Sequence, residues 1–276
     1  MLMRKPLAGT RPFGALLLCC LCHTALADRV ADITEVYAAA GVPGQEREPP
    51  AGWRAVVGLG LASAEEVVGD GERRTLVLPV LLMTYDDWAY WSIAGGGVWI
   101  RSTDRSLHLG VGVKLHAGWR PEDDPLLAGM DRRDTSVDGS LNLLWKTPVV
   151  DVGLNYYRDL LDVSDGSFAS LRLSRTFLVD PRIRLTPSLG VERQSDELVD
   201  YYYGVRPSEA TSFRPAYDGR ATVNVTLGLT GAYLLNRGWS LLGAFHATRF
   251  GDGVADSPIV PDRTSRLLFF GAVRRL

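Results

Sequence analysis

The sequence alternates apolar and polar residues over most of its length, and this period of two constrains the fold more than any other feature. The clearest example is Leu107–His116, in which leucine or valine at every second position alternates with His108, Gly110, Gly112, Lys114 and His116. Successive side chains of a β-strand point to opposite faces, so the segment predicts a strand with one apolar face and one polar or small face. The same pattern recurs over 137–145, 150–156 and 221–233.

Eleven segments carry the pattern, and many are about ten residues long, the length that a tilted strand needs to cross a bilayer. They are 53–62, 75–84, 88–100, 107–116, 137–145, 150–156, 169–177, 182–193, 221–233, 239–250 and 266–276. Bacterial barrels contain an even number of strands, so we expect one segment to hide two. The sequence therefore predicts an all-β fold over 53–276, a single antiparallel transmembrane β-barrel of about 12 strands (10–12).

A soluble β-sandwich also alternates, but its polar face is solvated and charged. Here the polar positions of the best segments are mostly small or uncharged, which is typical of the lumen face of a transmembrane barrel. Aromatic residues near the segment ends, Trp53, Trp145, Tyr233 and Trp239, fit the girdles that such rings form at membrane interfaces. The pattern favours the barrel over the sandwich.

The first 27 residues have the form of an export signal. Basic residues precede a short apolar run over 13–22, and Ala25-Leu26-Ala27 fits a peptidase site, so we expect cleavage before Asp28. A buried N-terminal helix is the alternative interpretation. Residues 28–52 are then expected to be a periplasmic lead-in. All three cysteines lie inside the predicted signal, which leaves the mature chain without disulfides or thiolate ligands.

Composition excludes other classes of protein. The formal net charge is -2 and the basic residues form no run, so a nucleic-acid partner is not expected. Beyond residue 27 the sequence contains no apolar stretch approaching the roughly 18–20 residues that a spanning helix needs. The predicted localisation is the cell outer membrane, where the barrel contacts lipid and lipopolysaccharide.

The polar positions of the predicted strands carry no recognisable catalytic or metal-binding pattern. His108 and His116 share a face but lie roughly 26 Å apart along a strand, too far for one metal ion. We therefore expect no catalytic residue, metal or cofactor, and no enzymatic activity. The polar residues are interpreted as candidate lumen residues: His108, Lys114, His116, Asn142, Asn155, Arg172, Arg184 and His246.

Acidic residues cluster between the strands, where the simplest interpretation is solvated loop tips. The sharper hypothesis is an interaction surface, which contacts lipopolysaccharide through divalent cations or docks a partner. Two prolines stiffen the loop over 252–262, which fits a binding surface or a plug folded into the lumen. The candidate surface comprises Asp123, Asp124, Tyr217, Asp218, Asp252, Asp256, Ser257 and Pro258.

Short motifs in order along the chain resemble the MipA/OmpV family of outer-membrane proteins. They are Val57-Gly-Leu-Gly-Leu61, Leu76-Val-Leu-Pro-Val80, Gly95-Gly-Gly-Val98, Asp123-Asp-Pro-Leu-Leu-Ala-Gly129, Tyr203-Gly-Val205, Pro215-Ala-Tyr-Asp218 and Gly251-Asp-Gly-Val-Ala-Asp-Ser-Pro-Ile-Val260. The last motif is the most specific. The sequence departs from the family at its end, where Leu276 replaces the aromatic residue that the barrel-assembly machinery reads.

The resemblance implies a scaffold that does no covalent chemistry. Family members are associated with a murein lytic transglycosylase and a bifunctional penicillin-binding protein, so these enzymes and the barrel-assembly machinery are the implied partners. The alternative from another class is a small diffusion channel of the outer membrane, in which the lumen residues would set selectivity.

Overall fold

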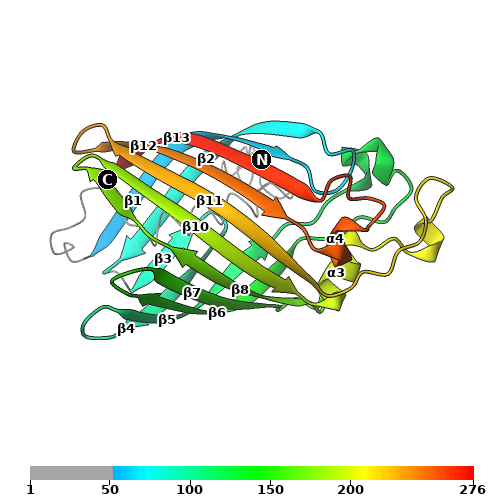
Figure 1. Ribbon diagram of the computed structural model, residues 1–276, viewed down its shortest axis with the longest axis horizontal. Helices are drawn as coiled ribbons and strands as arrows, with labels where there is room; N and C mark the ends of the chain where they lie inside the picture. The colour runs from blue at the N-terminus through cyan, green and yellow to red at the C-terminus, as the bar shows by residue number, and fades with distance from the viewer. Residues whose placement is uncertain (1–51, 87) are drawn as a thin grey trace, which may run out of the picture.

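The computed structural model describes residues 52–86 and 88–276, and in this part the chain forms a closed antiparallel β-barrel (Figure 1). The predicted signal peptide and nearly all of the predicted lead-in lie outside the described residues. The strands are β1 (Trp53–Glu65), β2 (Arg73–Tyr85), β3 (Ala89–Ser92), β4 (Gly95–Arg101), β5 (Leu107–His116), β6 (Ser136–Lys146), β7 (Asp151–Asp159), β8 (Ser167–Ser174), β9 (Phe177–Asp180), β10 (Ile183–Gln194), β11 (Thr222–Leu234), β12 (Trp239–Arg249) and β13 (Thr264–Arg275).

Apart from β8 and β9, strands that are consecutive in the sequence pair with each other, and β1 pairs with β13 to close the barrel. Strands β8 and β9 pair with successive parts of β10, so together they occupy one position in the wall. The prediction of about twelve strands is thereby confirmed. The segment 88–100 hides the extra strand, because it forms a hairpin of β3 and β4. The hairpin turns just before Gly95, whose φ of 155° is one that other residues rarely adopt.

The outer surface of the barrel is an apolar belt. On β11, Val223, Val225, Leu227 and Leu229 are exposed, while Thr222, Asn224 and Thr230 of the opposite face are buried. The belt continues around the wall through Leu59, Leu61, Val77, Ile100, Leu109, Val111, Leu141, Leu154, Leu171, Leu189, Phe245, Leu268 and Phe270. Apolar side chains outside and polar ones inside are the pattern of a barrel that contacts lipid.

The two ends of the barrel differ, and we call them the turn end and the loop end (Figure 1). The turn end holds short connections, the start of β1 and the end of β13, whereas the two-residue turn between β3 and β4 points toward the loop end. Trp53, Trp145, Tyr233 and Trp239 are all exposed at this end, as expected for an interfacial girdle. Leu276 lies there too, and its N–H donates to the Ala55 carbonyl.

The loop end holds the long connections and the helices. These are η1 (Pro121–Asp123), η2 (Pro125–Leu127), α3 (Asp196–Tyr203), η3 (Pro207–Glu209) and α4 (Asp252–Ala255). Within the described residues, no helix is both long enough and apolar enough to span a bilayer.

Two strand prolines lie where the hydrogen-bonded ladder is interrupted on one side. Pro79 of β2 pairs with Leu59, but the short β3 reaches only residues 82–85 of β2. Pro187 of β10 lies level with the break between β8 and β9. Proline cannot donate to a ladder, so it is tolerated in a strand where a partner is missing. The sequence thus marks both interruptions.

The inward face is apolar on one side of the barrel. Buried side chains of β1, β2, β12 and β13 form a cluster there, which comprises Val56, Ala62, Ala64, Leu78, Leu82, Leu242, Ala244, Leu267, Phe269 and Val273. The polar inward residues lie mainly on β5 to β11, so the interior has an apolar side and a polar side.

Candidate functional site

Four loops fold together at the loop end into a structure that we call the loop cap, which comprises residues 66–72, 117–135, 195–221 and 250–263 (Figure 1). Hydrogen bonds join loops that are distant in sequence. Gly69 donates to the Ile259 carbonyl at 2.9 Å, and the Trp119 indole donates to the Tyr202 carbonyl at 2.9 Å. The loops are therefore one packed unit and not separate solvated tips.

Helix α3 is the centre of the loop cap. It begins after Ser195, whose hydroxyl accepts the Leu198 N–H, and acidic residues in the first turn favour the positive end of the helix. Its buried face contributes Leu198, Val199 and Tyr202, and Tyr203 packs against all three apolar clusters of the cap. These clusters bury Val67, Val68, Trp119, Leu127, Met130, Tyr157, Phe168, Val205, Phe250, Val254, Ile259 and Val260.

A buried ion pair joins two loops of the cap. Arg133 donates to both carboxylate oxygens of Glu209, at 3.0 and 2.9 Å, and both side chains are at most 3% exposed. The backbone N–H groups of Asp131 and Arg206 donate to the same carboxylate. Burial alone would raise the pKa of Glu209, but the Arg133 guanidinium and the two N–H donors lower it to about 2. The carboxylate is thus charged at any physiological pH.

Arg214 is the largest of the fully buried side chains in the described structure. Its guanidinium donates to the carbonyls of Leu126, Ala128 and Glu209, which belong to two different loops. A buried cation hydrogen-bonded to carbonyls of two loops stabilises one arrangement of these loops, because an opening of the contact would leave the buried guanidinium without these acceptors.

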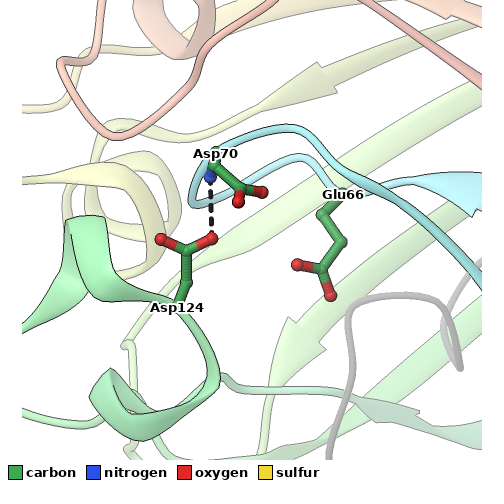
Figure 2. A group of neighbouring side chains, drawn as sticks. All are labelled: Glu66, Asp70 and Asp124. Carbon is green, nitrogen blue, oxygen red and sulfur yellow. Dashed lines mark hydrogen bonds between the residues drawn. The ribbon is translucent and has the colours of Figure 1, made fainter.

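Three carboxylates meet where the β1–β2 loop contacts the β5–β6 loop, as Figure 2 shows. Oxygen atoms of Glu66, Asp70 and Asp124 all lie within 4.8 Å of one another. Asp124 is buried and accepts the backbone N–H of Asp70 at 2.8 Å and that of Leu126 at 2.7 Å. Its two oxygens therefore hold the contact between the loops.

In this group of three carboxylates, Glu66 has a pKa well above the usual value for glutamate. Burial is the main cause that raises its pKa to about 7, and the neighbouring Asp124 and Asp70 raise it further. Arg74, whose Nε lies 2.9 Å from Glu66 Oε1, opposes the shift. Contact between these loops therefore involves a group that titrates near neutral pH.

Beneath the cap, polar and aromatic side chains of the inward face contact α3. His116 Nδ1 lies 3.2 Å from Asp138 Oδ2, and the His116 ring stacks on Tyr202 with 4.5 Å between centroids. Lys114 lies over the rings of Tyr157 and Phe168, at 5.4 and 5.7 Å from their centroids. Two predicted lumen residues, Lys114 and His116, thus form the floor of the cap.

The other predicted lumen residues lie on the same face of their strands but are spread around the barrel. Asn142 and Asn155 are directly opposite on β6 and β7, and they donate to Ser140 and Ser170 respectively. His108 and His246 are buried on β5 and β12, far apart in the strand order. Arg172 of β8 and Arg184 of β10 complete the inward set. A role in the lumen stays a prediction.

The predicted interaction surface divides in two. Asp124 and Ser257 are buried within the cap, where the Ser257 hydroxyl donates to the Tyr203 carbonyl. Asp252 and Asp256 are exposed and both pair with Arg263, at 2.7 and 2.5 Å. Asp218 is exposed, and Asp123, Tyr217 and Pro258 are half-buried. The accessible part of this surface excludes Asp124 and Ser257, and its role stays a prediction.

Sequence reasoning did not find the residues that hold the cap, namely Arg133, Glu209, Arg214 and the buried face of α3. One signal was available for the helix, because Ser195 followed by two acidic residues is a common N-terminal capping pattern. The ion pair joins residues 76 positions apart, and nothing local marks it.

The family model described as MltA-interacting protein MipA matches residues 57–276. The chain belongs to the MipA family. The resemblance found in the sequence motifs is thereby confirmed. This MipA-family chain is 26% identical over 219 residues to the MltA-interacting protein of Escherichia coli K12, which covers 78% of the chain and 87% of that relative.

A second relative supports the same location. The chain is 31% identical over 133 residues to the outer membrane protein OmpV of Vibrio cholerae, a match that covers 48% of the chain and spans about half (51%) of OmpV. Among solved structures, the COG4313 outer membrane channel of Pseudomonas putida F1 aligns with a TM-score of 0.43 and 13% identity, over 86% of this chain and all of that one.

The MipA-family protein is thus an outer-membrane β-barrel, and family and fold both point to a non-enzymatic protein. In such barrels short turns face the periplasm and longer loops face the exterior. This rule assigns the turn end to the periplasm and the loop cap to the outside of the cell.

Proposed function

We propose that the protein is a non-catalytic outer-membrane scaffold that brings a murein lytic transglycosylase together with a bifunctional penicillin-binding protein. Support for the partner comes from the family, since the Escherichia coli relative that matches 78% of the chain is named MltA-interacting protein. Contacts with lipopolysaccharide and with the barrel-assembly machinery belong to the same proposal.

The observation that carries the non-catalytic part is how the cap uses its polar groups. Arg133, Glu209 and Arg214 are buried and hydrogen-bonded to other loops, and Asp124 accepts two backbone N–H groups. A catalytic centre needs polar groups that reach a substrate. Here these charged groups are hydrogen-bonded to other loops of the same protein. Such an arrangement suits a rigid body that presents its surfaces to partner proteins.

The mechanism under this proposal is co-localisation. Two enzymes bound to one barrel have a high effective concentration for each other, and neither needs a direct contact of high affinity. The enzymes act in the periplasm, so the turn end of the barrel is the side on which they would bind.

Co-sedimentation with proteoliposomes tests the proposal. The full chain is reconstituted and mixed with purified MltA-type transglycosylase and a bifunctional penicillin-binding protein. We expect both enzymes to sediment with the proteoliposomes, and the second to be retained more strongly when the first is present. Empty liposomes and liposomes with an unrelated barrel of similar size are the controls. Retention no greater than in these controls would refute the scaffold.

The polar side of the interior is the observation that favours the alternative, a small diffusion channel. The interlocked loop cap opposes it, because α3 packs directly on the inward residues His116 and Phe168. Planar-bilayer recording separates the two functions. Under the scaffold proposal the reconstituted protein gives no steady conductance, whereas reproducible open steps would favour the channel.

A further inference from the structure

The barrel wall is interrupted in its loop-end half between β2 and β5. The hairpin of β3 and β4 fills the wall there, but β3 reaches only residues 82–85 of β2. In the described part of the chain, no strand pairs with residues 73–81 of β2 on the side that faces β5. We call the space above the hairpin turn, between 73–81 and the end of β5, the wall notch. Three strand spacings cross it at the hairpin, which is about 14 Å.

The wall notch lies at the depth of the lipid. Val77 of the β2 edge is exposed on the outer face. Leu61 and Leu59 of β1, which pair with Val77 and Pro79, belong to the same exposed apolar belt. On the inward face of this stretch Leu78 is buried in the apolar cluster of the interior. The notch therefore joins the lipid-facing belt to the apolar side of the barrel interior.

The open edge of β2 carries backbone groups that need hydrogen-bond partners. The Trp88 N–H donates to the Tyr85 carbonyl, so Tyr85 directs its backbone groups to the hairpin side of β2. This direction alternates along a strand, and Leu81, Pro79 and Val77 therefore direct their backbone groups the same way, into the notch. Proline has no N–H, so one donor is missing at the centre of the edge. Leu81 and Val77 keep both of their backbone groups.

The chemistry of this edge selects its occupant. An open sheet edge does not occur in contact with lipid, because hydrocarbon offers no hydrogen bonds. Water is a poor substitute, because the inward face of the same stretch is apolar and a buried water needs several polar partners. The edge also points along the wall toward β5 and not outward to a neighbouring barrel. An extended polypeptide segment inside the notch satisfies the edge.

The chain supplies such a segment from a point directly beneath the notch. Gly52 lies beside the turn between β2 and β3, since its N–H donates to the Asp86 carboxylate and its carbonyl accepts the Asp86 N–H. The predicted lead-in, 28–51, precedes Gly52 and is therefore tethered at the foot of the hairpin. Within 28–51, the longest run without a charged residue or proline is 36–42, Val-Tyr-Ala-Ala-Ala-Gly-Val.

The lengths of these segments match the position of the notch. Trp53 pairs with Tyr85, so Leu81 and Val77 lie four and eight residues along β2 from the level where the lead-in ends. These separations are about 13 and about 26 Å. Residues 43–51 span up to about 30 Å when extended. They therefore bring 36–42 level with the open edge.

We propose that residues 36–42 occupy the wall notch and complete the barrel wall as an added strand. A segment that descends to Gly52 runs parallel to β2, and its backbone then pairs with Val77 and Leu81. Its small and apolar side chains suit a place between the lipid belt and the apolar side of the interior. The inference goes beyond the scaffold function, because it makes the lead-in a seal of the wall.

Cysteine crosslinking in isolated outer membranes tests the proposal. All three natural cysteines lie in the predicted signal peptide, so an introduced pair stands alone in the mature chain. Each test pair combines Val80→Cys, next to the open edge, with Ala38→Cys, Ala39→Cys or Ala40→Cys. The matched control pairs use Ser188→Cys instead, on β10 and five strand positions from β2. Copper phenanthroline is the oxidant, and heat-modifiable gel mobility checks that each barrel is folded.

We expect at least one test pair to form an intramolecular disulfide in at least about fivefold higher yield than its control pair, because the notch raises the effective concentration of the two thiols. Equal yields would show that the lead-in has no preferred place at the notch, and would overturn the proposal. A disulfide-linked dimer of the Val80→Cys single variant would assign the notch to a second copy of the chain, and would overturn it too.

Hydrogen–deuterium exchange of the wild-type chain in nanodiscs gives a test without substitutions. Hydrogen-bonded strands exchange slowly, so peptides from 36–42 should exchange at least about tenfold slower than peptides from 43–51. In a chain that lacks 28–42, residues 75–81 of β2 should exchange about tenfold faster or more, while β11 keeps its wild-type rate. Equal exchange of 36–42 and 43–51 in the wild-type chain would refute the added strand.

Discussion

Replacement of Glu209 by alanine is expected to open the loop cap and leave the barrel intact. The change removes both carboxylate oxygens that receive Arg133, at 3.0 and 2.9 Å, and the acceptors of the Asp131 and Arg206 N–H groups, at 2.9 and 3.0 Å. Arg133 is then a buried cation without its counter-ion. Breaking a buried pair in this way costs about 3–5 kcal/mol, which is on the order of a hundred- to several-thousand-fold in the equilibrium between closed and open cap.

Hydrogen–deuterium exchange of the folded protein in detergent measures this equilibrium. Peptides from 117–135 and 195–221 are expected to exchange faster by a factor of that order, while peptides from β11 keep wild-type rates. Asp252→Ala is the matched control, because its pair with Arg263 is exposed and screened by solvent, so it contributes little to stability. An increase below about threefold in the two loops, or an equal increase in β11, would show that the pair does not hold the cap.

Three further predictions concern the cap and the wall. Because the pKa of Glu66 is raised, the folded cap binds a proton more tightly than the unfolded loop does. The stability of the cap should therefore fall as the pH rises from about 4.5 to about 7. Glu66→Gln should remove this pH dependence in exchange experiments. Leu227→Arg, on the exposed belt, should destabilise the barrel by about 2–4 kcal/mol in urea refolding into bilayers, and a loss below about 0.5 kcal/mol would contradict a lipid-facing position. Gly219→Ala should speed exchange of α3, because the added Cβ would lie 2.3 Å from the Asp200 nitrogen, whereas Gly238→Ala, with its nearest atom at 3.9 Å, should not.

The wall of the barrel could be predicted from the sequence because its faces alternate residue by residue. On β5, Leu109, Val111 and Val113 are exposed to lipid, whereas His108 and Lys114 point inward. The alternation of apolar and polar residues in the sequence predicts this difference directly. The hairpin of β3 and β4 was less visible. Strand β3 is only four residues long and β4 begins with three glycines, so 88–100 has the pattern of one strand.

The loop cap could not be predicted, because its order comes from contacts between distant segments. The acids between strands have the sequence signature of solvated tips, yet Asp124 and Glu209 are both buried. Each is stabilised by a donor from another part of the chain, Asp70 for the first and Arg133 for the second. Neither a periodicity nor a local motif in the sequence predicts such a pairing.

The packed cap changes where the chain tolerates substitution. The outer face of the wall needs only apolar side chains of moderate size, so Leu227 or Val111 can be exchanged for another aliphatic residue at little cost. In the cap, Val199, Val254 and Ile259 are fully buried, and Arg214 has three specific acceptors. Random mutagenesis should therefore find the outward loops of this protein less permissive than its membrane-facing strands, the reverse of the usual order for loops and scaffold.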